Sequence, residues 1–206
     1  MVINMKIIDI SRDLLNCPIY PGDPPPEYEW ARKIEKGADC NLSVLTACVH
    51  TGTHCDAPLH FLADGAGVES LPPEALIGPC TVLELNPGEI TGEYVNRHFP
   101  IGGCERLLLK SGGKAFFMDS AAQETAALPG LCLIGTDALS VGSKGNQVRP
   151  HRAFLSKGIV LLEGLELSAV KPGNYFLFAA PVKLGGLEGA PARAFLIEDR
   201  IFWMGK

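Results

Sequence analysis

The sequence lacks the features of exported and membrane proteins. No apolar run reaches the roughly 18 residues that cross a bilayer, and even the apolar stretch 158–170 contains Glu163 and Glu166. Residues 1–13 do not show the basic segment and apolar run of a signal peptide. The seven cysteines include no C-x-x-C pair, and their odd number is typical of reduced thiols. We therefore expect a cytoplasmic protein without a membrane partner.

Positive charge is also scarce. The 206 residues contain 18 Lys and Arg against 23 Asp and Glu, a net charge of −5, and Arg32, Lys33 and Lys36 form only a scattered cluster. This is too little positive charge for a nucleic-acid footprint. With 47% hydrophobic and 20% charged residues, the chain lies far from disordered compositions. No linker or repeat divides it, so one domain over residues 1–206 is predicted.

Short apolar runs alternate with helix-like segments along the chain. The runs predict strands at residues 7–10, 42–49, 80–85, 107–109, 131–134, 159–162, 175–178 and 194–197. Helices are predicted at residues 73–77, 91–99, 120–128 and 150–157, the last opened by Pro150 and ended by Gly158. The predicted fold class is therefore α/β, with a mixed and strand-rich sheet.

The segment 16–26 is rich in proline, which excludes a regular helix or a central strand there. Two interpretations stay open. The segment is either a stiff surface connection or a loop that lines a site.

Histidine is rare, yet three of the five histidines fall within residues 50–60, HTGTHCDAPLH. His50 and His54 have the spacing of the helical pair in zinc proteases. However, Thr51 stands where that motif needs a glutamate, and Gly52 and Pro58 oppose a helix. A helical metalloprotease site is therefore disfavoured.

An extended chain would place the even-numbered residues His50, His54, Asp56 and His60 on one face and turn Cys55 away. Imidazoles and a carboxylate form a ligand set for zinc, manganese or iron, and three protein ligands leave a position for water or substrate. The pattern predicts a catalytic metal site. The alternative is local hydrogen bonding around a turn.

The segment resembles H-x-G-T-H-x-D-x-P-x-H, the signature of the cyclase family of metal-dependent hydrolases, which includes bacterial kynurenine formamidase. Every fixed position is matched. The similarity continues through residues 20–23 (YPGD), 135–137 (GTD), 151–165 and 181–193, and so covers nearly the whole chain. The resemblance implies a single mixed-sheet α/β domain of the swivelling β/β/α type and a homo-oligomer, a dimer or larger.

The resemblance also implies two divalent metal ions, Zn²⁺ or alternatively Mn²⁺. His50, His54 and Asp56 would hold the first ion, and Asp56 would bridge to a second ion held by His151 and Glu163. His60 would be the catalytic acid and base.

The small-molecule substrate implied by the resemblance is N-formylkynurenine, an aryl formamide hydrolysed to kynurenine and formate in tryptophan catabolism. Two alternatives remain. One is hydrolysis of a cyclic amide or another small amide, and the other is a non-catalytic protein that binds metal or ligand.

Four residues outside this ligand set also have candidate roles. Tyr20 stands where formamidases of the family carry a tryptophan, so the resemblance implies that it binds the substrate, the alternative being a tyrosine that packs its own loop. Cys48 is a candidate for thiol oxidation near the metal. Lys183 or Arg193 would receive a substrate carboxylate, the alternative being solvated surface charge.

Overall fold

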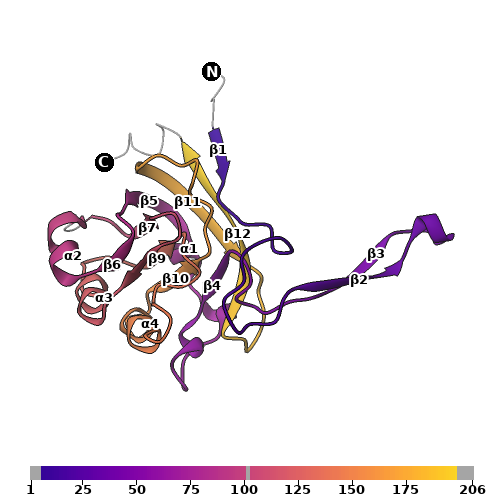
Figure 1. Cartoon of the computed structure of the whole chain (residues 1–206), viewed down its shortest axis with the longest axis horizontal. Coiled ribbons are helices and arrows are strands. Elements are labelled where there is room, and N and C mark those ends of the chain that lie inside the picture. The colour runs from indigo at the N-terminus through magenta and orange to yellow at the C-terminus, as the bar shows by residue number, and fades with distance from the viewer. Residues whose placement is uncertain (1–5, 101–102, 199–206) are drawn as a thin grey trace.

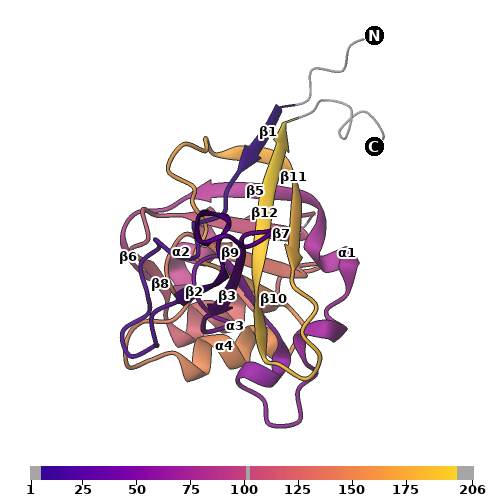
Figure 2. The same ribbon diagram turned by 90° about the vertical axis from the view of Figure 1, so that its right-hand side faces the viewer.

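The computed structural model describes residues 6–100 and 103–198. Its centre is an eight-stranded sheet, which Figures 1 and 2 show from two sides. The order of the strands is β1-β12-β11-β5-β7-β9-β10-β4. Because β4 also pairs with β12, all of these strands except β1 form a closed ring. Their bounds are β1 (Lys6–Asp9), β4 (His54–Asp56), β5 (Ile77–Glu84), β7 (Arg106–Lys110), β9 (Leu133–Thr136), β10 (Val160–Glu163), β11 (Gly173–Pro181) and β12 (Gly189–Glu198).

Strands β5, β7, β9 and β10 run parallel, and the other pairings in the sheet are antiparallel. Parallel strands covered on both faces are expected to be apolar throughout rather than alternating. Leu107 and Leu109 accordingly belong to one core cluster and Leu108 to another, and all three are buried. The sheet therefore separates a core inside the ring from a core beneath the helices.

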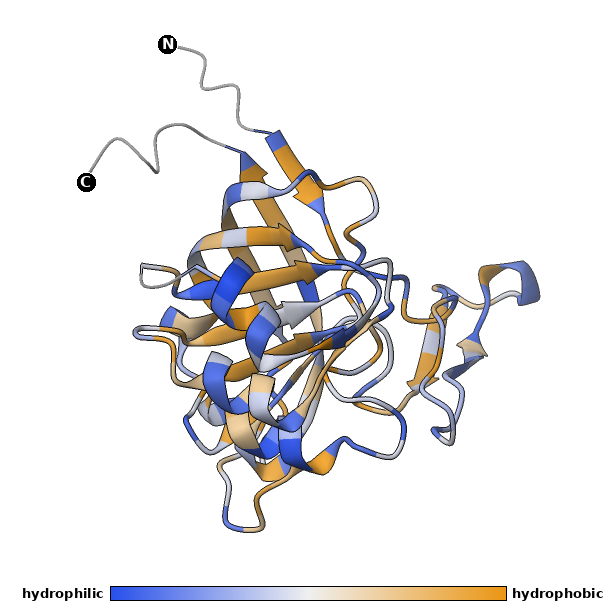
Figure 3. Cartoon of the chain, turned by 60° about the vertical axis from the view of Figure 1, so that its left-hand side comes forward, coloured by the Kyte–Doolittle hydropathy of each residue, from blue (hydrophilic) through white to orange (hydrophobic). Residues whose placement is uncertain are grey.

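The helices α2 (Gly92–His98), α3 (Asp119–Ala126) and α4 (Val148–Leu155) lie together on one side of the sheet (Figure 1). A short parallel pair, β6 (Gly88–Ile90) and β8 (Ala115–Phe117), lies among them, and α1 (Pro73–Leu76) leads directly into β5. Figure 3 shows hydrophobic residues concentrated on the strands and hydrophilic residues on the helices. In the described part of the chain, no helix is long and apolar enough to span a membrane.

Two strands leave the body of the protein as a separate ribbon (Figure 1). These are β2 (Glu27–Arg32) and β3 (Leu42–Thr46), joined through the 3₁₀ turn Ile34–Lys36. We call this ribbon the β2–β3 arm. Every residue of its two strands is exposed, although a two-stranded ribbon by itself is marginally stable in water.

The α/β class and the mixed sheet are confirmed, and each predicted strand and helix overlaps an observed one. Four strands were missed: β4, β6 and β8 have three residues each, and β2 alternates charged with apolar residues. The expectation of an extended segment around the histidines is wrong in part. Only His54–Asp56 is a strand, whereas His50 lies in a turn and His60 ends a 3₁₀ turn.

Phe154 should be a main contributor to stability. Its side chain is fully buried on α4, with its ring 5.1 Å from that of Phe117. We expect Phe154→Ala to lower the free energy of unfolding by about 3–5 kcal/mol, because a large cavity is left under the helices. Urea denaturation measures this loss, with Phe178→Ala as the control, since Phe178 is 38% exposed. An equal loss in both variants would contradict the assigned core.

Candidate metal centre

The strand β4 positions two of the predicted residues. It pairs with β10 on one side, where His54 lies opposite Glu163, and with β12 on the other. Successive side chains of a strand point to opposite faces. Cys55 therefore enters the core inside the ring, where burial raises the pKa of its thiol, and it faces away from the site as predicted.

The turn before β4 is held tightly against the end of β10. The Thr53 hydroxyl donates to the Gly164 carbonyl at 2.7 Å. Gly164 has a φ of +67°, and a Cβ there would lie 2.2 Å from the Gly52 carbonyl oxygen. Only glycine permits this close approach, which brings the His50 turn beside Glu163.

Backbone carbonyls orient two of the imidazoles. Nδ1 of His54 lies 3.0 Å from the Gly52 carbonyl, and Nδ1 of His151 lies 2.7 Å from the Gln147 carbonyl. A carbonyl only accepts hydrogen bonds, so each Nδ1 donates, and in the neutral ring each Nε2 keeps its lone pair for a ligand. Metal-binding histidines are commonly oriented by such contacts.

The five predicted ligands lie together, and we call them the histidine–carboxylate centre: His50, His54, Asp56, His151 and Glu163. Oδ1 of Asp56 lies 3.0 Å from His50 Nδ1 and 3.4 Å from His54 Nε2. Its Oδ2 lies 3.7 Å from His151 Nε2. Glu163 also lies between two histidines, with Oε2 3.6 Å from His54 Nε2 and Oε1 3.4 Å from His151 Nε2.

The two carboxylates attract positive charge to the centre of this cluster. Burial lowers the pKa of His54, but Asp56 and Glu163 outweigh burial and raise it to about 9. Burial also acts to lower the pKa of His151, yet Glu163 and Asp56 raise it. Burial raises and the histidines lower the pKa of Asp56, which ends well below its ordinary value.

The donor set fits a divalent metal ion. Asp56 is fully buried, and its Oδ2 has no hydrogen-bond partner; the buried Nε2 of His50 also has none. Unpartnered buried polar atoms are rare in folded proteins and need a reason. Two groups, His50–Asp56–His60 and His54–Asp56–Glu163, bring their ligand atoms within 4.8 Å of one another, and imidazole with carboxylate suits zinc or manganese.

His60 lies at the edge of the centre, and it also belongs to the group of potential ligands formed with His50 and Asp56. Its ring stacks on that of His50 with centroids 4.0 Å apart and lies 5.9 Å from that of His151. Burial lowers the pKa of His60, which favours a neutral imidazole at neutral pH. Neutral imidazole can accept a proton, so the position suits general acid–base chemistry.

A cavity of 170 Å³ opens onto the centre. Tyr20 and Cys48 line it together with His50, His54, His60, His151 and Glu163. Five wall residues had no role in the sequence prediction: Asp23, Phe61, Leu139, Ser140 and Gln147. Asp23 belongs to the YPGD segment and Phe61 follows His60, whereas Leu139, Ser140 and Gln147 lie between the segments 135–137 and 151–165 and outside both.

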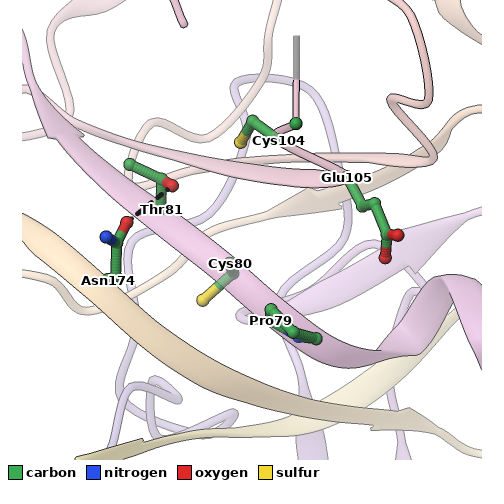
Figure 4. Close-up of a pocket in the computed structure, with 7 residues that line it drawn as sticks. Pro79, Cys80, Thr81, Cys104, Glu105 and Asn174 are labelled. Atoms are coloured by element: carbon green, nitrogen blue, oxygen red, sulfur yellow. Dashed lines mark hydrogen bonds between the residues drawn. The ribbon is translucent and has the colours of Figure 1, made fainter. Parts of the chain in front are cut away.

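A second cavity, of 140 Å³, lies elsewhere on the sheet, between β5, β11 and the segment before β7 (Figure 4). Its wall includes Cys80 and Cys104, and Thr81 donates to Asn174 across it. Burial raises the pKa of Cys80 to about 12 and also raises that of Cys104. Protonated thiols are poor nucleophiles and poor ligands, so this cavity lacks the chemistry of the first.

The two predicted cationic residues lie outside the first cavity. Arg193 forms an exposed ion pair with Asp9, and Lys183 is exposed. Neither side chain lines the cavity in the described part of the chain. Solvated surface charge, the alternative given above, is therefore the better description of Lys183.

Metal binding can be tested through stability. Adding Zn²⁺ or Mn²⁺ to chelator-treated protein should stabilise it by about 2.7 kcal/mol at a hundredfold excess over Kd. Asp56→Asn should lose most of this gain, because Asp56 contacts His50, His54 and His151. Thermal unfolding with and without metal measures the difference. His98→Ala is the control, since His98 is an exposed helix end; an equal gain in Asp56→Asn would contradict the assigned centre.

Comparisons with known proteins identify the family and the fold of the chain. Residues 8–143 match the Cyclase family model, described as "Putative cyclase". The kynurenine formamidase of Salinibacter ruber is 35% identical over 207 residues, covering 93% of this chain and 97% of the relative. A solved structure titled as a potential metal-dependent hydrolase with cyclase activity superposes with a TM-score of 0.80 at 32% identity, covering 95% of this chain and 98% of that one.

The fold is shared more widely. Isatin hydrolase A from Labrenzia aggregata has a TM-score of 0.82 at 19% identity, with 95% of this chain and 94% of that one covered. At this identity the likeness concerns the fold alone. The family model and the curated relative show that the chain belongs to the cyclase family of metal-dependent hydrolases.

Proposed function

We propose that the protein hydrolyses N-formylkynurenine to kynurenine and formate in tryptophan catabolism. The observation that carries the proposal is the histidine–carboxylate centre at the end of a cavity that also contains Tyr20 and His60. Curated relatives with this activity in their names cover almost the whole chain. The free state of all seven cysteines supports a cytoplasmic location.

We further propose that the centre holds two divalent ions, with Zn²⁺ preferred over Mn²⁺. His50 and His54 face Oδ1 of Asp56, whereas His151 faces Oδ2. This division supports one ion on His50, His54 and Asp56 and a second on Asp56, His151 and Glu163. Divalent ions at such a site supply Lewis-acid polarisation of the carbonyl and activation of water at neutral pH.

His60 is the proposed acid and base. As a neutral imidazole it takes a proton from the attacking water and later gives one to the aniline nitrogen of the departing kynurenine. Its position beside His50 and His151 places it at the edge of the centre, within the cavity. Protonating the weakly basic aniline nitrogen makes it a good leaving group.

Tyr20 is proposed to bind the aryl ring of the substrate. Its side chain lines the cavity, whose described wall contains no Lys or Arg. A tyrosine ring can stack on an aryl ring. A second candidate substrate is a cyclic amide, because a solved structure at 32% identity is titled as a potential metal-dependent hydrolase with cyclase activity. The same centre would open that ring, and the amine would stay attached to the product.

Direct turnover tests this function. Metal-loaded protein should hydrolyse N-formylkynurenine with a kcat/KM of about 10⁴ M⁻¹s⁻¹ or more. His60→Ala should keep its bound metal, measured by elemental analysis, and lose about 10²- to 10⁴-fold in kcat because proton transfer is removed. Unchanged turnover in this variant would exclude His60 as the acid and base. Loss of metal would instead make His60 a ligand.

We also propose that the chain forms a homodimer or a larger homo-oligomer through the β2–β3 arm. Tyr28 and Trp30 lie next to each other on one face, with their ring centroids 6.0 Å apart. Leu45 is the cross-strand partner of Tyr28. All three are about half exposed. An apolar face on a ribbon without further support favours a protein partner, and a second copy is the partner always present.

The arm proposal can be tested by placing a charge on that face. Trp30→Asp should weaken self-association at least tenfold, because a carboxylate would have to be buried against the second copy. Sedimentation equilibrium over a concentration series measures the effect. Val182→Asp is the matched control, since Val182 is exposed outside the arm. An identical association constant in both variants would exclude the arm from the interface.

A further inference from the structure

A tight turn fixes two wall residues of the cavity relative to each other. The backbone N–H of Asp23 donates to the Tyr20 carbonyl at 3.0 Å. Pro21 and Gly22 stand between them, and Gly22 has a φ of +112°. Proline followed by a glycine with positive φ is the pattern of a type II β-turn, whose first and fourth Cα atoms lie within about 7 Å.

Both ends of this turn face the cavity. Tyr20 and Asp23 line it from the same segment, and both are half-buried. Because proline and glycine preset the turn, little conformational entropy is lost when a ligand contacts both side chains. The turn therefore presents an aromatic ring and a carboxylate as one rigid unit.

The carboxylate of Asp23 is not committed elsewhere in the described structure. None of the hydrogen bonds or ion pairs among the described residues uses its oxygens, whereas Glu163, the other carboxylate in the wall, accepts from the Val141 N–H and faces His54 and His151. Asp23 also lies outside both groups of potential metal ligands found among those residues. It is thus a negative charge at the cavity with neither a metal nor a structural role.

The rest of the described wall leaves the Asp23 carboxylate free to select a cationic group of a ligand. It contains no Lys or Arg to pair with Asp23. The histidines of the wall contact the two carboxylates of the histidine–carboxylate centre or stack on its imidazoles, and Ser140 and Gln147 are neutral and bond to each other at 3.3 Å. A negative carboxylate repels anionic groups and attracts cationic ones. A ligand group near Asp23 should therefore be a cation.

We propose that Asp23 determines specificity by binding the ammonium group of an amino-acid substrate while Tyr20 contacts its aryl ring. This rests on the proposed function, because it assumes an aryl amide in the cavity. It assigns a residue to recognition of the ammonium group of N-formylkynurenine, a group that simple aryl formamides lack. The contact binds substrate away from the reacting carbonyl, so it lowers KM and contributes little to kcat.

The test compares two substrates that differ only in this group. These are N-formylkynurenine and its deamino analogue, 4-(2-formamidophenyl)-4-oxobutanoate, each assayed with metal-saturated enzyme. In the unaltered enzyme, kcat/KM should be about tenfold higher for the ammonium substrate, the expected effect of a charge-assisted hydrogen bond. Asp23→Asn should abolish this preference through a rise in KM for the ammonium substrate.

Two variants separate the contact from general charge and folding effects. Asp23→Glu retains the carboxylate and should recover part of the preference. Glu89→Gln removes the same charge from an exposed residue outside both the cavity and the β2–β3 arm and should keep the full preference. If Asp23→Asn keeps the tenfold preference, or reduces turnover of both substrates equally, the inference is wrong while formamide hydrolysis stands. If the unaltered enzyme hydrolyses neither substrate, the proposed function itself fails.

Discussion

The closure of the sheet by β4 is the constraint on which the site depends. This strand has only three residues, yet it pairs with β10 and with β12 at once. Its position leaves no freedom in where its side chains point. Cys55 enters the apolar core, so His54 and Asp56 must face the opposite side, where Glu163 and the helix carrying His151 meet them. A short polar strand thereby becomes the rigid part of a metal site.

Burying these charged groups costs folding free energy when no cation is bound. Two carboxylates and two of the imidazoles are almost entirely removed from water, and buried charges are costly unless they are fully paired. Oδ2 of Asp56 and Nε2 of His50 have no hydrogen-bond partner, although His151 lies 3.7 Å from the first and Glu188 lies 3.4 Å from the second. A cation satisfies these atoms and neutralises the carboxylates. The centre is thus a place where the sequence departs from the rules for a stable core in favour of function, as active sites often do.

The sequence predicted the elements well wherever the hydrophobic pattern was long enough. The runs at β7, β9 and β10 are apolar because both faces are buried, and they were recognised for that reason. The site residues were predicted from the local histidine cluster and the family resemblance, and the structure brings them together. Alternate residues of an extended chain share one face, and this prediction holds for His54 and Asp56. His50 and His60 instead reach the site from turns. Ser140 and Gln147 could not be predicted, because only the folded chain places them at the cavity.

The pairing partners of β4 also set the order in which the molecule can be completed. Residues 54–56 emerge early from the ribosome, but their partners at 161–163 and 189–191 are made more than a hundred residues later. Until then the strand has no sheet to join, and His151 and Glu163 are absent from the growing chain or not yet in place. Assembly of such distant contacts is slow compared with local helix formation. The histidine–carboxylate centre therefore comes together only after residue 163 has been made and β4 has joined its partners in the sheet.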